Sequence, residues 1–161
     1  MAKRDPEIEA LRHALATVAY RGGKALRGAP DDFAEFRVAA GTRTSLELLA
    51  HVNDLFDWML HLAEGKHVWQ DSTPGSWPGE VERFYRGLAA VDARLANGRP
   101  LGFPPERLFQ GPIADALTHV GQLAMLRRLA GAPVKGENYF KADIRAGVVG
   151  AEQPPPVREF D

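Results

Sequence analysis

Apolar residues recur every three or four positions in four segments of the chain, a spacing typical of α-helices with one buried face. The segments cover residues 7–26, 44–64, 80–96 and 112–131. Glycine- and proline-containing stretches separate them, and no useful length of chain alternates apolar and polar residues as a half-buried β-strand would. The pattern therefore predicts an all-α protein in which the four helices form a bundle.

Sequence signals mark where the second and fourth helices begin. Thr44 is followed three positions later by Glu47, which is the spacing of a capping box with Thr44 at the N-cap. Gly65 follows the last apolar position of this segment and favours a helix end there. Proline is favoured in the first turn of a helix, so the fourth helix is expected to open at or near Pro112.

Two segments outside the predicted helices are long. Residues 66–79 exceed the usual length of a connection between helices and carry Trp69, and such connections often serve a function. The tail, residues 132–161, has weak periodicity and ends near a run of prolines, so we expect an ordered but irregular arm with loose last residues. The chain is expected to form a single domain, with the bundle over about residues 7–131 and the arm after it.

Composition and charge narrow the possible functions. The 161 residues carry a net charge of −1, which does not suit a nucleic-acid-binding surface. The absence of cysteine excludes disulfides, thiolate nucleophiles and cysteine-based zinc sites, and leaves His, Asp and Glu as the strong metal ligands. No segment reaches the roughly 18 consecutive apolar residues of a membrane span, and the charged start resembles no secretory signal. We expect a cytoplasmic protein that binds neither nucleic acid nor membranes.

Three ionisable residues stand within the apolar helical stripes. His51 falls on the leucine face of the second helix, in step with Leu48 and Leu55. Asp115 and His119 are four positions apart in the fourth helix and are therefore neighbours on its surface. Helical bundles hold metals with such pairs when another helix presents a further ligand. The sequence thus predicts that His51, Asp115 and His119 bind one divalent metal, either Zn²⁺, Ni²⁺, Fe²⁺ or Mn²⁺.

Each member of this trio also has an ordinary structural explanation. A histidine on an apolar face is most often a hydrogen-bonded core residue, and Asp115 near a helix start would complement the helix dipole. Three buried ionisable groups on two helices nevertheless require a shared explanation, which a metal provides. The other histidines are weaker candidates, because His61 lies about 15 Å from His51 along the helix. His13 and His67 are expected to be exposed.

Further polar residues are candidates for roles beside the metal. Gln122 is a candidate contact to the substrate or to a metal ligand, and Glu137 is a candidate general base. Asn53 and Asp54 either orient the imidazoles or, as we expect, are solvated helix residues. The segment 136–143 contains two aromatic residues among polar ones, and it is expected to form a lid over the metal, a structural clasp or a dimer contact.

Two short motifs resemble landmarks of the DinB-like superfamily. Residues 48–54, LLAHVND, resemble its histidine motif on the second helix, and residues 119–123, HVGQL, resemble its H-x-G-Q motif on the fourth. The resemblance implies a four-helix bundle, often dimeric, that holds a divalent metal near one end through three residues. In that family the place of Asp115 is taken by histidine. The carboxylate here either shifts the preference toward Fe²⁺ or Mn²⁺ or marks a site that has lost its metal.

The resemblance also implies a class of reaction. The better-understood relatives are metal-dependent hydrolases or thiol S-transferases that act on small molecules, including low-molecular-weight thiols. In either case the metal would activate a water or lower the pKa of a thiol. The alternative is a non-catalytic, metal-free bundle that binds a ligand or a second copy of itself, with the polar trio hydrogen-bonded. Since the family is often dimeric, the resemblance also leads us to expect a homodimer.

Overall fold

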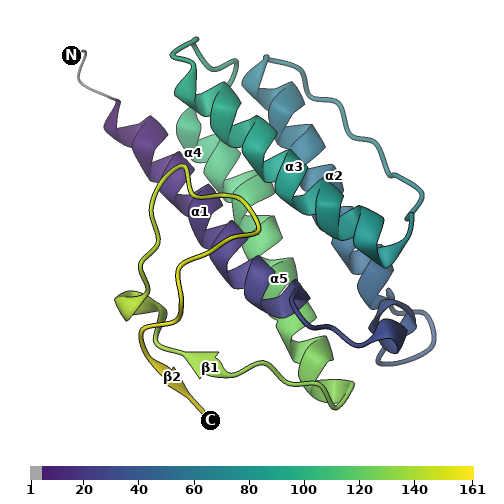
Figure 1. The fold of residues 1–161 in the computed structure, drawn as a ribbon. Coiled ribbons are helices and arrows are strands. Elements are labelled where there is room, and N and C mark those ends of the chain that lie inside the picture. The colour runs from purple at the N-terminus through teal and green to yellow at the C-terminus, as the bar shows by residue number, and fades with distance from the viewer. Residues whose placement is uncertain (1–4) are drawn as a thin grey trace.

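The computed structural model describes residues 5–161, and long helices make up most of it (Figure 1). The charged start of the chain therefore lies largely outside the described residues. The elements in chain order are α1 (Pro6–Leu26), η1 (Asp31–Glu35), α2 (Ser45–Ala63), α3 (Trp77–Ala96), α4 (Pro105–Leu108), η2 (Phe109–Ile113), α5 (Ala114–Leu129), β1 (Gly136–Glu137), η3 (Tyr139–Lys141) and β2 (Glu159–Phe160). The all-α prediction is confirmed, since the strands that the structure describes are two residues long.

Side-chain caps set the starts of α2 and α3. The predicted capping box is present: Thr44 Oγ1 accepts from Glu47 N at 3.1 Å, and the Glu47 carboxylate accepts from Thr44 N at 2.7 Å. The third helix starts at Trp77 rather than at residue 80, because the Ser76 hydroxyl accepts from Gly79 N at 3.2 Å and caps it there. The connection between α2 and α3 therefore ends at residue 76, three residues earlier than predicted.

The predicted start of the fourth helix at Pro112 is wrong. Helical backbone begins at Pro105 and continues through the π-helical turn η2 into α5. Pro112 lies inside that turn, where its missing N–H removes one α-helical hydrogen bond. The extra residue of a π-turn rotates all following side chains by about 100° around the helix axis. After this rotation Asp115 and His119 lie on the side of α5 that faces α2.

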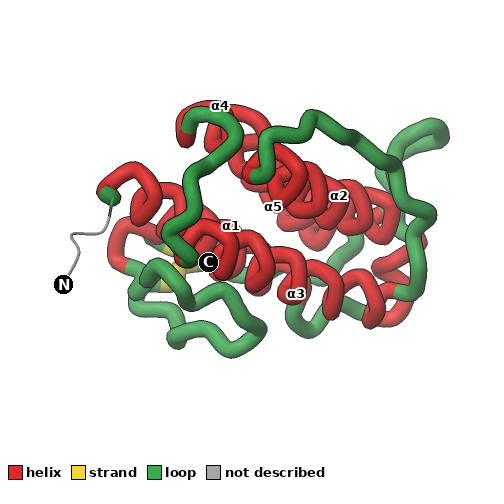
Figure 2. The backbone as a smooth tube through the Cα atoms, turned by 90° about the horizontal axis from the view of Figure 1, so that it is seen from above, coloured by secondary structure: helices red, strands yellow, loops and turns green. Residues whose placement is uncertain are grey.

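Each long helix packs against two others (Figures 1 and 2). Both α1 and α2 contact α3 and α5. Helices α2 and α3 run in the same direction, because Asp54 in the middle of α2 pairs with Arg83 in the second turn of α3, and Glu64 at the end of α2 pairs with Arg94 near the end of α3. The connection between them therefore returns along the outside of α2 to the end where α2 begins (Figure 1).

The predicted apolar stripes meet in one core. Its largest fully buried side chains include Phe33, Phe56, Phe84, Leu15, Leu49, Leu55, Met59 and Leu88. Gly22 allows α1 and α3 to approach closely, since a Cβ there would lie 2.5 Å from Cζ of Phe84. No helix among the described residues combines the length and apolar character that crossing a bilayer requires.

The C-terminal arm packs along α1, on the side away from α2 (Figures 1 and 2). It is irregular, as predicted, apart from short elements. The prediction of loose last residues is wrong, because β2 pairs antiparallel with β1. The fully buried Glu137 carboxylate accepts hydrogen bonds from the Tyr20 hydroxyl at 2.6 Å and from Lys24 Nζ at 2.8 Å. Lys24 Nζ also donates to Glu159 at 2.8 Å, so both strands are tied to α1.

Candidate metal centre

His51 on α2 meets Asp115 and His119 on α5, and the three offer ligand atoms that all lie within 4.8 Å of one another. Asp115 Oδ2 is 3.9 Å from His51 Nε2, and its Oδ1 is 3.2 Å from His119 Nε2. The two imidazole rings pack edge to face with their centroids 4.8 Å apart. The structure therefore brings together the three residues that the helical stripes singled out.

The surrounding backbone explains why these side chains converge. His51 lies in the second turn of α2, whose start is fixed by the capping box at Thr44. Asp115 follows η2, in a helical run that begins at Pro105. Asp115 is thus not at a free helix start, so the helix-dipole explanation for an acid at this position does not apply.

The trio is less buried than the sequence predicted. The imidazole side chains of His51 and His119 are 16% and 12% exposed, whereas that of Asp115 is 46% exposed. The two histidines are therefore enclosed and the carboxylate forms an open side. Among the three side chains, that of Asp115 is therefore the one most exposed to solvent.

Gln122 orients the ring of His119. Its Oε1 lies 2.7 Å from His119 Nδ1, and because an amide oxygen only accepts, Nδ1 carries the proton. The other ring nitrogen, Nε2, then points toward Asp115 Oδ1, 3.2 Å away. Either a proton on Nε2 or a metal ion bound by both atoms satisfies this pair.

The environment also favours the neutral form of His51. Burial lowers the pKa of His51 below its ordinary value, and the nearby charges of Arg43 and His119 lower it further, while Asp115 acts in the opposite direction. Neutral imidazole is the form of histidine that binds metals. The burial of His51 thus favours the form of its ring that can bind a metal.

Aromatic residues of the α2–α3 connection cover one side of the site. The Trp69 ring packs against His51, with 5.5 Å between the centroids, and its edge meets Trp58 at 5.8 Å. His67 stacks on Trp58 at 5.7 Å. The sequence indicated a functional role for this connection through its length, but only the structure shows that Trp69 reaches His51.

Asn53 and Asp54 play neither of the roles considered from sequence. Both side chains are buried rather than solvated. Asn53 Nδ2 donates to the backbone oxygen and the carboxylate of Glu80, at 2.9 and 2.8 Å. Asp54 accepts from Arg83 at 2.6 Å and from Ser72 N at 3.0 Å. These residues join α2 to α3 and to the connection between them, instead of orienting the imidazoles.

Glu137 does not join the trio. Both of its carboxylate oxygens accept hydrogen bonds from α1, and the arm that carries it lies beside α1 (Figure 2). Of the three interpretations of segment 136–143, the clasp agrees with these contacts. The remaining histidines, His13, His61 and His67, are exposed and lie outside the trio.

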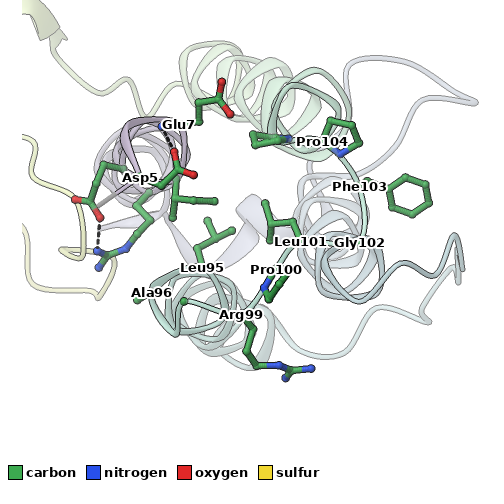
Figure 3. Close-up of a pocket in the computed structure, with 15 residues that line it drawn as sticks. Asp5, Glu7, Leu95, Ala96, Arg99, Pro100, Leu101, Gly102, Phe103 and Pro104 are labelled. Atoms are coloured by element: carbon green, nitrogen blue, oxygen red, sulfur yellow. Dashed lines mark hydrogen bonds and ion pairs between the residues drawn. The ribbon is translucent and has the colours of Figure 1, made fainter. Parts of the chain in front are cut away.

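Two cavities differ in their relation to the site. One of about 860 Å³ lies where α1 begins and α3 ends (Figure 3), and its lining includes Ile8, Leu95, Leu101 and Asp5 but no member of the trio. A groove of about 370 Å³ is lined by His51 together with residues of the loop before α2. The smaller groove therefore adjoins the trio through His51, whereas the larger cavity does not adjoin it.

Comparison of the chain with protein-family models, with curated proteins and with solved structures returned no match. The resemblance to the DinB-like superfamily thus depends on the motifs around His51 and His119 and stays a prediction.

Proposed function

We propose that the chain is a DinB-like four-helix bundle and a metal-dependent enzyme, with one divalent metal held by His51, Asp115 and His119. The observation that carries this proposal is the convergence of three ligand atoms from two helices within 4.8 Å. It is strengthened by the hydrogen bond that His119 Nδ1 donates to Gln122 Oε1, which holds the ring with Nε2 toward the same point.

The distances between these atoms fit a shared ion. Ligand atoms at about 2.1 Å from one ion lie at most about 4.2 Å apart. The contacts of Asp115 with His119 and His51, at 3.2 and 3.9 Å, are inside this limit. The two imidazole nitrogens, within 4.8 Å of each other, need at most a small ring rotation. Two nitrogens and one carboxylate favour Fe²⁺ or Mn²⁺ and also accept Zn²⁺ or Ni²⁺.

The chain's own residues divide the remaining work. Gln122 holds the His119 ring in one orientation, and Trp69 packs against the His51 ring and excludes water from that side. The open side at Asp115 admits a small molecule. A bound metal would act as a Lewis acid there, toward a water in a hydrolase or toward a thiol in a thiol S-transferase. We propose one of these two activities, on a small-molecule substrate that includes low-molecular-weight thiols.

The first test is metal content. Protein purified without a histidine tag is expected to contain about one Fe, Mn, Zn or Ni per chain by elemental mass spectrometry, and His51→Ala/His119→Ala is expected to lose it. The matched control is His13→Ala/His61→Ala, which removes the same number of imidazoles from exposed positions and should retain the metal. Equal metal content in the two double variants would contradict the assignment of these ligands.

Absence of metal from the unmodified protein would favour the non-catalytic alternative. In that case a proton would take the place of the metal, and His119 would form an ion pair with Asp115 at the 3.2 Å separation. The two possibilities differ in their response to added metal, since only a metal site gains thermal stability on titration with Mn²⁺ or Zn²⁺.

A homodimer is also proposed. Its support is the outer face of α5, where Met125 and Leu129 are 53% and 55% exposed one turn apart. Gly121, one turn earlier, has nothing within 4 Å of the place of a Cβ. Light scattering of Met125→Lys/Leu129→Lys should show a monomer if this face forms the contact. Cytoplasmic location stays a prediction.

A further inference from the structure

We propose that Arg43 binds the carboxylate of an anionic substrate in the groove beside His51. This inference rests on the proposed metal-dependent function and adds the chemical class of its substrate, a small carboxylic acid. It is carried by the position of Arg43 in the groove that His51 also lines, and by the fact that no ion pair or hydrogen bond engages its guanidinium within residues 5–161.

The groove connects the proposed metal centre to the loop before α2. His51 and Ala50 line it from α2, and residues 41–43 line it from the loop. Its volume of about 370 Å³ is at the lower end of the range for small-molecule sites. A molecule that reaches both His51 and Arg43 is therefore small.

The acidic groups in the groove already have partners. Glu47 accepts from the backbone at the α2 N-cap and lies 3.9 Å from Arg37. Asp54 accepts from Arg83 at 2.6 Å. Asp71 accepts from an indole N–H at 3.2 Å. Glu47 and Asp54 thus each lie beside an arginine, whereas the exposed Asp71 keeps its charge; Arg37 is partly neutralised by Glu47.

Arg43 differs from these groups. It is exposed, and within residues 5–161 no ion pair or hydrogen bond engages its guanidinium. The backbone that carries it is fixed on both sides. A turn closed by the hydrogen bond from Thr42 N to Ala39 O, with Gly41 at φ +81°, precedes it, and the Thr44 cap of α2 follows it.

This arrangement suits a carboxylate ligand. A guanidinium offers parallel N–H donors that match the two oxygens of a carboxylate, and a fixed backbone reduces the entropy lost on binding. A mercapto or amide group at the other end of such a molecule would lie toward His51. Simple mercapto acids therefore combine the two features that the site is proposed to recognise.

The test compares mercaptoacetate with mercaptoethanol, its neutral analogue of similar length. Both are titrated into Co²⁺-loaded protein and followed by the visible absorption of the metal. The ratio of their dissociation constants is measured in four proteins: unmodified, Arg43→Gln, Arg43→Lys and the control Arg86→Gln, which removes an exposed arginine from α3. Arg43→Gln is expected to reduce the preference for the acid by about fivefold. Arg43→Lys should retain part of it, and Arg86→Gln all of it.

An unchanged preference in Arg43→Gln, at one Co²⁺ per chain, overturns the role of Arg43 and leaves the metal proposal standing. If the protein binds no Co²⁺, the metal proposal fails, and Arg43 is tested separately in the metal-free protein. Propionate is then titrated while the Arg43 side-chain Nε–H resonance is followed by NMR. A saturable shift, absent with propionamide, supports carboxylate binding, and no shift overturns it.

Discussion

Replacement of Glu137 distinguishes a structural clasp from a catalytic residue. The side chain is 0% exposed, and its carboxylate accepts from Tyr20 and Lys24 at 2.6 and 2.8 Å. Glu137→Leu keeps an apolar side chain of similar length but removes both acceptors. Glu137→Gln keeps the shape and one acceptor oxygen but removes the charge. The two variants thus separate the loss of charge from the loss of hydrogen bonding.

The expected magnitudes follow from what each variant leaves behind. In Glu137→Leu the buried Tyr20 hydroxyl loses its acceptor, which costs about 1–3 kcal/mol. Breaking a buried ion pair costs about 3–5 kcal/mol, but Lys24 keeps Glu159 at 2.8 Å, so only part of this is lost. We expect Glu137→Leu to lower the free energy of unfolding by about 3–4 kcal/mol and Glu137→Gln by about 1–2 kcal/mol.

Urea denaturation followed by circular dichroism measures these losses, and hydrogen exchange shows whether the amides of the arm open first. Glu152→Leu is the control, since Glu152 is an exposed acid of the same arm and its replacement should change stability by less than about 0.5 kcal/mol. Metal content should be the same in all variants. An unchanged unfolding midpoint for Glu137→Leu would refute the clasp. Loss of metal at unchanged stability would show instead that Glu137 takes part in the metal centre.

Three further outcomes are expected. Gln122→Ala should weaken metal binding about 10- to 100-fold in a chelator competition, whereas Gln110→Ala, on the same helical run, should not. Gly102→Ala should lower the free energy of unfolding by about 1–3 kcal/mol, because its Cβ would lie 2.0 Å from a backbone nitrogen; Gly150→Ala meets nothing and should not. The pKa of Tyr20 is raised above its ordinary 10.0, by burial and then by its bond to a buried carboxylate. The stabilisation that the protonated Tyr20 hydroxyl provides is therefore complete below pH 10.0 and is lost as the pH rises above it. Tyr20→Phe should reduce this alkaline fall in the free energy of unfolding.

The helices and the Asp115–His119 pair were predictable because both depend on local spacing. The capping box at Thr44 and the three–four apolar repeats describe interactions within one helix, and these occur in the structure. Asp115 and His119 are neighbours for the same reason. That His51 would oppose them was a weaker inference, because it depends on how two distant helices pack.

The failures of prediction share a physical cause. A proline fits the first turn of a helix and also a π-turn, and the sequence around Pro112 does not distinguish the two. Asn53 and Asp54 have the composition of a solvated helix face, yet α3 supplies them with buried partners. Arg43 and Trp69 come from loops, and no local pattern indicates which helix a loop residue will contact.

The direction of α3 accounts for the form of the proposed site. Because α3 runs parallel to α2, the connection between them must return along the length of α2. That return brings Trp69 against His51 on one side, while the loop before α2 brings Arg43 to the groove on another. An antiparallel α3 would need only a short turn, and the ring beside His51 would be lost. The length of the connection is therefore a consequence of the helix order, and the aromatic ring that covers His51 is a consequence of that length.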